Sequence, residues 1–223
     1  MANYTDKKNE WEQQASSFEN YKMQVGRPVN DTEWDALVAD IRNKLVLNEK
    51  IDSIIDVGCG NGLILSQLKD SADDIYGIDY AASMVEHAKK LLPYGYFKVG
   101  EAAKLDFKHG AFDRVLSYSI FHYFPSEEYI LQVIDELIRV TKQGGIILIG
   151  DLLDKRFEAK IKGESNLDYE QKIPLIHRHS EWTFCDLDRI SSVLENKVQK
   201  VEVLQQPASF KLKDYRKDLR IWL

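Results

Sequence analysis

The chain has 223 residues, of which 44% are hydrophobic and 30% are charged, and its formal net charge is −6 at pH 7. This size and composition suit one α/β domain, and the mild negative charge argues against a protein that binds duplex nucleic acid through a basic face. Two cysteines, Cys59 and Cys185, exclude both a disulfide framework and a zinc site made of cysteines alone.

Targeting signals are not visible in the sequence. The opening stretch MANYTDKKNEWEQQ has no apolar segment of the kind that a secretory signal contains. No apolar run approaches the roughly 20 residues that a transmembrane helix needs. We therefore expect a reduced, cytoplasmic protein with no membrane partner.

Two helices are predicted before the first strand. Residues 7–23 place Trp11, Ala15 and Phe18 along one face. A second helix begins after Asn30, which has the capping-box spacing to Glu33, and it carries a continuous apolar stripe to residue 45.

From residue 53 onward, strands and helices alternate. Strands are predicted at 54–57, 75–78, 96–99, 114–119 and 146–149, with helices at 62–68 and 82–92 and another that Ser126 caps. Residues 152–180 are polar and irregular, a helix resumes near residue 186, and strands are predicted at 198–204 and 219–223. The alternation predicts an α/β fold with a parallel sheet and helices on both faces.

The stretch IIDVGCGNGL, residues 54–63, places three glycines directly after the first strand. In an open parallel sheet, ligands bind at the carboxyl ends of the strands, and the first strand-to-helix turn is a frequent contact. Glycines there permit positive φ and remove the Cβ atoms that would hold a ligand away. The sequence therefore predicts a ligand lying against this backbone.

Two acids indicate which ligand it is. Asp56, two residues before Gly58, would repel a pyrophosphate and would suit an ammonium group. Asp79 ends the second strand, where an acid typically accepts hydrogen bonds from ribose hydroxyls. An amino acid and a ribose in one crevice describe S-adenosylmethionine.

Four segments in order resemble the class I S-adenosylmethionine-dependent methyltransferases. They are DVGCGNGLILSQL with its G-x-G-x-G signature, YGIDYAASMVEHAKK at 76–90, VGEAAKLDFKHGAFDRVLSYSIFHYF at 99–124 and LIRVTKQGGIILIGD at 137–151. The resemblance implies a doubly wound, mostly parallel, seven-stranded Rossmann-like sheet whose last strand is antiparallel. It also implies methyl transfer from S-adenosylmethionine.

The resemblance further implies a set of cofactor-binding residues. The glycine turn would lie under the methionine part, Asp79 would bind the ribose, and Tyr80 and Met84 would pack on the adenine. Glu101 stands where the family usually has Asp, and it is one methylene longer. The implied cofactor-binding residues are Asp56, Gly58, Cys59, Gly60, Gly62, Asp79, Tyr80, Met84, Glu101, Ala102 and Ser117.

Residues for the acceptor are predicted outside these motifs. His122 and Asp151 are candidate catalytic residues, as general bases for an acceptor that needs one. Substrate-binding candidates are Tyr21, Arg27, His177 and Arg178, and a loose basic group (Lys155, Arg156, Lys160, Lys162, Arg178) would suit an anionic acceptor. His177 and His179 form an H-x-H pair without a third ligand, so no metal is expected.

We interpret residues 1–223 as a single domain, with a helical lid at 1–50, a cofactor-binding core at 51–151, and an acceptor-facing segment with the closing strands at 152–223. The predicted function is transfer of a methyl group to O or N of a small polar or anionic metabolite, with no nucleic acid as partner. An NAD(P)-dependent oxidoreductase is one alternative, although Leu63 replaces the last glycine of G-x-G-x-x-G. A non-catalytic S-adenosylmethionine-binding module is another. The identity of the acceptor and the oligomeric state are not readable from the sequence.

Overall fold

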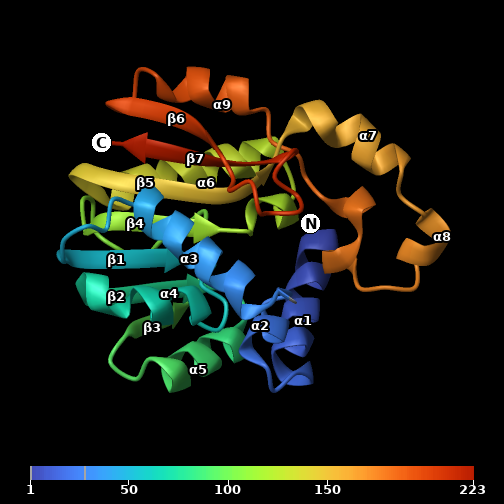
Figure 1. Cartoon of the computed structure of the whole chain (residues 1–223), viewed down its shortest axis with the longest axis horizontal. Coiled ribbons are helices and arrows are strands. Elements are labelled where there is room, and N and C mark those ends of the chain that lie inside the picture. Colours follow the sequence, from blue (N-terminus) through green and yellow to red (C-terminus); the bar gives the residue numbers. More distant parts are fainter. Residues whose placement is uncertain (1, 28) are drawn as a thin grey trace.

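A mixed sheet runs through the chain, with seven strands in the order β3-β2-β1-β4-β5-β7-β6 among the residues described (Figure 1). The structure is a computed structural model and describes residues 2–27 and 29–223; residues 1 and 28, both in the predicted lid segment, lie outside that description. The strands are β1 (Ile51–Val57), β2 (Ala72–Asp79), β3 (Tyr96–Val99), β4 (Phe112–Tyr118), β5 (Thr141–Leu153), β6 (Lys200–Gln205) and β7 (Arg216–Trp222).

The strand directions confirm the predicted fold class. Strands β1 to β5 pair in parallel, whereas β7 runs antiparallel to both β5 and β6. The order reverses between β1 and β4, because β2 and β3 lie on one side of β1 and the later strands lie on the other. Such a switch point opens a crevice at the carboxyl ends of the strands.

Helices cover both faces of the sheet. The helices are α1 (Ala2–Ser17), α2 (Tyr21–Gln24), α3 (Asp31–Lys44), α4 (Leu63–Leu68), α5 (Ala82–Leu91), α6 (Glu127–Val140), α7 (Glu158–Gly163), α8 (Leu167–Glu170) and α9 (Leu187–Leu194). Ile54 of β1 packs in the cluster formed with α3, α4 and α5, and its neighbour Ile55 packs in the cluster formed with α6 and α9. Burial on both faces explains why the central strands are almost continuously apolar.

The helical prediction for residues 7–23 was wrong in its extent. The chain leaves the helix after Ser17 and starts a short new one at Tyr21, capped by the Asn20 side chain, which accepts from Lys22 N and Met23 N. The capping box of Asn30 and Glu33 is confirmed at the start of α3. Because α3 packs its apolar stripe on the sheet, it belongs to the core.

Several strands are longer than predicted, and β5 and β7 show differences that matter for the site. β5 extends to Leu153 and β7 begins at Arg216, and these two residues are paired. Residues 152–180, predicted to be irregular, contain α7 and α8 and the 3-10 turns η3 (Lys155–Phe157) and η4 (Leu175–His177). In Figure 1 this orange segment lies beside α1, near the sheet edge where the parallel strands end. None of the helices within residues 2–27 and 29–223 combines the length and apolar character needed to cross a bilayer.

Candidate active site

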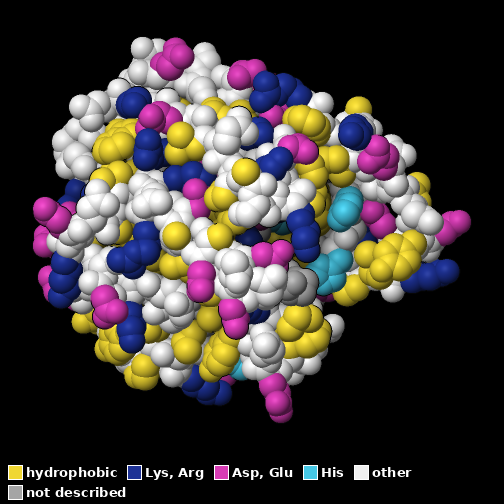
Figure 2. All heavy atoms as spheres, viewed as in Figure 1, with side chains coloured by type: hydrophobic (Ala, Val, Ile, Leu, Met, Phe, Trp, Pro, Cys, Tyr) yellow, Lys and Arg dark blue, Asp and Glu magenta, His cyan; other side chains and the backbone are white. Residues whose placement is uncertain are grey.

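A cavity of about 590 Å³ lies at the carboxyl edge of the sheet. Its wall includes the carboxyl ends of β1, β2, β4 and β5 and the segments that follow them, the segment after β3, α1, the loop after α2, and α3. The loop between β6 and β7 and the first residue of β7 complete it. Figure 2 shows histidine side chains beside hydrophobic ones at the surface on this side of the molecule. The three predicted parts of the chain, the lid, the core and the acceptor-facing segment, therefore all contribute residues to the wall of one cavity.

The glycine turn after β1 forms part of the wall. Gly58, Gly60 and Gly62 have φ values of 84°, 52° and 77°, which L side chains rarely adopt. A Cβ on Gly58 would lie 2.6 Å from the Ile120 side chain, and one on Gly60 would lie 2.9 Å from Val25 Cγ1. Gly58 and Gly60 line the cavity, so the backbone there is exposed to a ligand.

Gly62 lies at a contact between two helices and not at the cavity. A Cβ at this position would lie 3.1 Å from Ala88 Cβ, so the glycine permits α4 to pack closely on α5. It is not among the residues that line the cavity. The cofactor contact predicted for Gly62 is therefore replaced by a packing role.

Asp56 places an unsatisfied carboxylate oxygen in the cavity wall. The side chain is buried, and among the described residues its Oδ1 has no hydrogen-bond partner. Burial, and then the negative charge of Asp79, raise the pKa of Asp56 well above its usual value. A buried oxygen of this kind fits a cationic donor such as an ammonium group, which would supply both a hydrogen bond and a charge.

Asp79, the last residue of β2, contacts the glycine turn that follows β1. Its Oδ2 accepts from Gly60 N at 2.8 Å, and its Oδ1 accepts from Ala81 N at 2.9 Å. Burial raises the pKa of Asp79 to about 6, although these backbone donors act in the opposite direction. Each oxygen keeps a further lone pair, so the carboxylate fits hydroxyl donors on the cavity side.

The wall beyond Asp79 is mostly apolar. Tyr80, Met84 and Ala102 line the cavity, as predicted for an adenine site. Glu101 is exposed outside the lining and accepts a hydrogen bond from the Tyr4 hydroxyl of α1 at 3.0 Å. The predicted contact of Glu101 with adenine therefore requires this hydrogen bond to be shared or exchanged.

Helix α1 connects the two sides of the cavity. Glu12 accepts from Ala82 N at 2.6 Å and from Ser83 N at 2.9 Å, which caps α5 from outside because its own N-cap, Ala81, has no capping side chain. Glu10 accepts from Ile176 N at 3.0 Å in η4. Residues two apart lie about 200° apart around a helix. Glu12 therefore contacts α5 on one side of α1, and Glu10 contacts η4 on the other.

Asp151 organises the other end of the cavity. Its Oδ2 accepts from Ser119 Oγ at 2.5 Å, from Arg216 Nη1 at 2.5 Å and from Arg27 Nη2 at 3.2 Å. Ser119 and Asp151 both have positive φ, 64° and 66°, which marks strained backbone at the ends of β4 and β5. Burial alone would raise the pKa of Asp151, but the charges of Arg216 and Arg27 outweigh burial and hold it well below its usual value.

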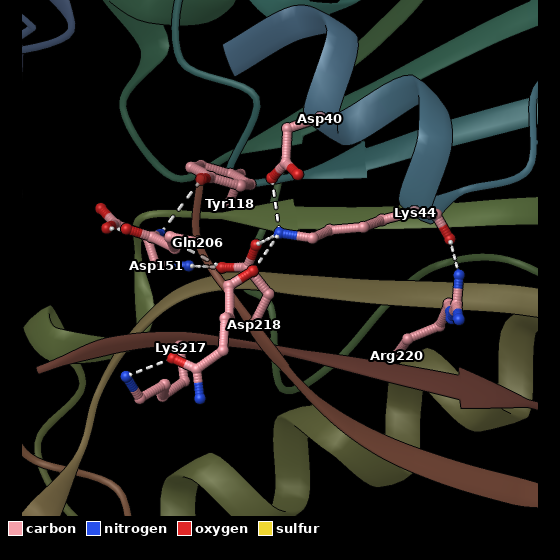
Figure 3. A network of polar contacts seen from close by, with 9 residues as sticks. Asp40, Lys44, Tyr118, Asp151, Gln206, Lys217, Asp218 and Arg220 are labelled. Atoms are coloured by element: carbon pink, nitrogen blue, oxygen red, sulfur yellow. Dashed lines mark hydrogen bonds and ion pairs between the residues drawn. The ribbon is translucent and has the colours of Figure 1, made fainter. Parts of the chain in front are cut away.

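A buried network supports Asp151 from behind (Figure 3). Asp218 of β7 accepts from Asp151 N at 2.8 Å and from Lys44 Nζ at 2.7 Å, and Lys44 also donates to Asp40 at 2.5 Å. Gln206 donates to Asp218 at 3.2 Å and to Asp151 at 3.3 Å. These contacts hold the Asp151 backbone in its strained conformation.

His122 lies close to this group. It is buried, and among the described residues its Nδ1 has no hydrogen-bond partner. Burial, and then the positive charge of Arg216, lower the pKa of His122 well below its usual value. The ring is therefore neutral at pH 7, and it packs against Trp182 with a centroid distance of 5.1 Å.

Comparison with protein families finds that residues 55–149 match the family described as a methyltransferase domain. Demethylmenaquinone methyltransferase from Thermotoga maritima is 33% identical over 136 residues, covering 59% of this chain and 56% of that protein. The tRNA (carboxymethyluridine(34)-5-O)-methyltransferase alkbh8 from Xenopus tropicalis is 34% identical over 96 residues, covering 43% of this chain and 15% of that protein. The chain thus spans less than two thirds of the length of both relatives.

A solved structure extends the likeness beyond these residues. The N-methyltransferase NodS from Bradyrhizobium japonicum, in complex with S-adenosyl-L-homocysteine, superposes with a TM-score of 0.72 at 12% identity, covering 97% of this chain and 98% of that one. At that identity the likeness is one of fold. Residues 55–149 thus form a methyltransferase domain, and the chain is similar in sequence and in fold to class I S-adenosylmethionine-dependent methyltransferases.

Most of the predicted cofactor residues surround the cavity. Asp56, Gly58, Cys59, Gly60 and Asp79 line it around the glycine turn, in addition to the apolar residues of the adenine side. Their contacts with the cofactor stay predictions. Ser117 was placed wrongly: it is fully buried, and its Oγ donates to Val57 O at 2.8 Å, so it joins β4 to β1 inside the sheet.

The predicted acceptor residues divide into two groups. Arg27 and His177 line the cavity, whereas Tyr21 and Arg178 do not, and Arg178 Nε donates instead to Ile173 O at 2.7 Å. Asp151 lines the cavity, but its three hydrogen bonds and its lowered pKa make it a poor general base. His122 also lines the cavity, and its lowered pKa makes it a weak base.

Several residues of the cavity wall were missed from the sequence, and three of them lie around His122 and Asp151. Arg216 and Trp182 line the cavity beside His122, and Ser119 holds Asp151. Arg216 lies before the predicted final strand, and a longer strand would have brought it to the cavity edge. Nothing in the sequence signals the positive φ of Ser119.

Metal binding finds no support at the H-x-H pair. Within residues 2–27 and 29–223, no group of three or more His, Cys, Asp or Glu side chains could hold a metal ion. His177 and His179 both line the cavity, and the His179 ring packs against Trp182 with a centroid distance of 4.2 Å. These histidines are part of the cavity wall.

Proposed function

We propose that this protein transfers the methyl group of S-adenosylmethionine to an oxygen or nitrogen of a small polar or anionic metabolite. The observation that carries the proposal is the pair of carboxylates at the glycine turn: Asp56 offers a buried oxygen that has no partner among the described residues, and Asp79 lies beside it at the cavity wall. A zwitterionic amino acid joined to a nucleoside matches both. Membership of the methyltransferase family supports the same donor.

The bound donor would supply a methyl group on a sulfonium, which is already activated for displacement. The chain's own residues then have to orient the two reactants, since alignment accounts for a large part of the rate in such reactions. Asp56 and Asp79 would hold the ammonium and ribose ends, and Tyr80 and Met84 would contact the adenine. The backbone of Gly58 and Gly60 would leave room for the methionine part.

The weak bases of the cavity favour certain acceptors. His122 has a lowered pKa, and Asp151 is committed to Ser119 and two arginines. A carboxylate, a phosphate or a neutral amine can attack without losing a proton to a strong base, whereas a sugar hydroxyl needs one. We therefore assign Asp151 a positioning role and favour an acceptor that is already nucleophilic at neutral pH.

We also propose that the chain works as one domain with three parts. Helices α1 and α2 would cover the cofactor, residues 51–151 would bind it, and residues 152–223 would face the acceptor. Support comes from the contacts of α1 with both α5 and η4. On the face drawn in Figure 2, acidic and basic side chains are interspersed, which suits a small acceptor better than nucleic acid.

Calorimetry with S-adenosylhomocysteine tests the donor site. We expect micromolar or tighter binding of S-adenosylhomocysteine and none of NADH. Gly60→Ala should weaken binding at least tenfold, because its φ is 52° and its new Cβ would press on Val25. Gly163→Ala is the matched control, since within the described structure a Cβ there meets nothing within 4 Å.

Turnover is then measured as S-adenosylhomocysteine release from S-adenosylmethionine with a panel of carboxylates, phosphates, amines and bulk tRNA. Product with a small acceptor supports the proposal. Stabilisation by NADH without S-adenosylhomocysteine binding would favour the oxidoreductase. Tight cofactor binding without product on any acceptor would favour a non-catalytic module, and product with tRNA alone would contradict the small-molecule assignment.

A further inference from the structure

The cavity wall carries two arginines against one carboxylate at the end formed by β5 and β7. Arg216 and Arg27 both donate to Asp151 Oδ2, and all three residues line the cavity. The neighbouring charges of Lys44, Asp40 and Asp218 lie behind the wall and are not part of the lining (Figure 3). Of the residues at this end that line the cavity, two are therefore positively charged and one is negatively charged.

Arg216 keeps an unused edge of its guanidinium. The side chain is 8% exposed, Nη1 donates to Asp151, and among the described residues Nε has no hydrogen-bond partner. Nε and Nη2 together form an edge that binds a carboxylate or phosphate through two parallel hydrogen bonds, and Nη1 is not part of it. A buried N–H without an acceptor is unfavourable, so the edge is suited to a ligand oxygen.

Neighbouring side chains complete a pocket for an organic anion. The guanidinium of Arg216 lies over the Trp182 ring at 5.2 Å, and that of Arg27 lies over the Tyr118 ring at 5.1 Å, so both are held in place by aromatic faces. His122 contributes a second buried nitrogen, Nδ1, without a partner in the described part of the chain. Trp11 and Tyr123, in edge contact at 5.5 Å, add an apolar wall.

We propose that the methyl acceptor is an organic anion whose carboxylate or phosphate binds the free edge of Arg216, with Arg27 and His122 as further contacts. This subsite rests on the proposed function, since it names the class of acceptor for that reaction. Asp151 then acts as a positioning residue, because it holds both arginines at the cavity wall. Ser119 and the backbone contact from Asp218 hold Asp151 in turn.

The test uses benzoate and phenyl phosphate as anionic probes and benzamide as their neutral counterpart. Each is titrated into the full chain by calorimetry, with and without saturating S-adenosylhomocysteine. We expect at least one anion to bind at least tenfold more tightly than benzamide, and the preference between the two distinguishes a carboxylate site from a phosphate site. Binding of S-adenosylhomocysteine is measured first and separately.

Variants assign the binding to the two arginines. Arg216→Gln should weaken the preferred anion at least tenfold and Arg27→Gln several-fold, with S-adenosylhomocysteine affinity changed less than twofold. Arg189→Gln, which removes an exposed arginine paired with Glu127, should change neither affinity. If Arg216→Gln does not fold, Arg216→Lys keeps a cation for Asp151 but lacks Nε and should show the same loss.

Two results would overturn the subsite. One is equal binding of the anions and benzamide by the wild-type chain. The other is an anion affinity that neither arginine variant alters. A chain that binds an anion through Arg216 but no S-adenosylhomocysteine would contradict the proposed function and leave the subsite standing, so the two failures are distinguishable.

Discussion

The raised pKa of Asp56 affects the folding stability of the protein when no ligand is bound. Its buried Oδ1 lacks a partner among the described residues, and its pKa is raised by burial and by Asp79. A group whose folded pKa exceeds its unfolded value binds more protons in the folded state. Stability therefore falls as pH rises above the ordinary value of 3.8 towards the raised one.

Asp56→Asn should accordingly have opposite effects on stability and on binding. At pH 8 we expect a higher melting temperature than wild type, because a buried carboxylate is no longer forced to ionise. We expect S-adenosylhomocysteine affinity to fall roughly tenfold or more, the effect of losing a charged hydrogen bond of about 1.5 to 3 kcal/mol. Thermal shift across pH 5 to 8 and calorimetry measure the two effects.

Asp106→Asn serves as the control for this pair of measurements. Asp106 is 96% exposed, with Lys98 at 3.5 Å, so neither quantity should change appreciably. A variant at Asp56 that loses stability and keeps its affinity would show that the carboxylate is structural and does not meet the ammonium.

At the residue scale, the sequence predicted correctly the cavity residues that lie at fixed positions after a strand. Asp56, Gly58, Gly60 and Asp79 follow strands in a fixed register, so their place at the cavity could be predicted. Ser117 failed because side chains alternate along a strand, and one position decides whether a hydroxyl faces the cavity or the sheet interior. The predicted roles of His122 and Asp151 as bases stay predictions. The sequence did not indicate that burial and a neighbouring arginine lower the pKa of His122, or that two arginines outweigh burial and lower the pKa of Asp151, because no motif encodes these neighbours.

Helix α1 is the element whose attachment should govern cofactor exchange. It carries Glu12 on the side of α5 and Glu10 on the side of η4. The Glu12 carboxylate serves as the missing cap of α5, and a side-chain cap contributes about 1 kcal/mol. Loss of that cap should loosen the helix without unfolding the sheet.

For Glu12→Gln, we expect amide hydrogen exchange in residues 2–17 to rise roughly fivefold, in line with a loss of about 1 kcal/mol in local stability. Stopped-flow measurements should show faster dissociation of S-adenosylhomocysteine, with global unfolding by urea little changed. Glu19→Gln, at an exposed position between α1 and α2, should leave both rates at the wild-type values. If amide hydrogen exchange in α1 were the same in Glu12→Gln as in wild type, Glu12 would not be what holds α1 against α5.

At the element scale, periodicity and caps gave most of the helices and all of the strands, with errors at their ends. The break after Ser17 was missed because Asn20 caps a helix of only four residues, too short for a period to register. β7 was predicted too short because its first residues are charged. Their burial against Leu152 and Leu153 depends on a partner strand that is distant in sequence.

The buried network in Figure 3 ties α3 to β7 across the molecule. Lys44 is 9% exposed and Asp218 is fully buried, and their ion pair measures 2.7 Å. Removing one partner of a buried pair leaves an uncompensated charge and costs about 3 kcal/mol or more. The pair therefore contributes to the whole fold as well as to Asp151.

Lys44→Met should lower the free energy of unfolding by about 3 kcal/mol in urea titrations. Adding Asp218→Asn to that variant should recover part of the loss, since the unpaired charge is then gone. Lys98→Met, on a side chain that is 59% exposed, should stay within about 0.5 kcal/mol of wild type. A loss in Lys44→Met that Asp218→Asn deepens would mean that side-chain packing, and not charge, explains the effect.

At the scale of the whole molecule, the fold class and the family were predictable because four motifs occur in one order along residues 50–151. The acceptor end was not, because it joins residues far apart in sequence. Three residues of the basic group predicted for an anion instead form ion pairs, namely Lys155 with Glu127 at 3.8 Å, Arg156 with Asp154 at 2.5 Å and Lys162 with Glu158 at 2.7 Å. The arginines at Asp151 come instead from distant segments: Arg27 from the loop after α2, and Arg216 from the first position of β7.

The reversed direction of β7 has a consequence for how such an enzyme can diversify. Because this strand runs against its neighbours, its first residue reaches the same rim as the glycine turn. Under the proposed function, residues 56–102 supply the donor contacts, whereas the acceptor contacts of Arg27 and His122 are completed by Arg216 of the terminal hairpin. On that proposal, we expect substitutions at the start of β7 to change the preferred acceptor while the residues of the glycine turn, which would hold the methyl donor, stay the same.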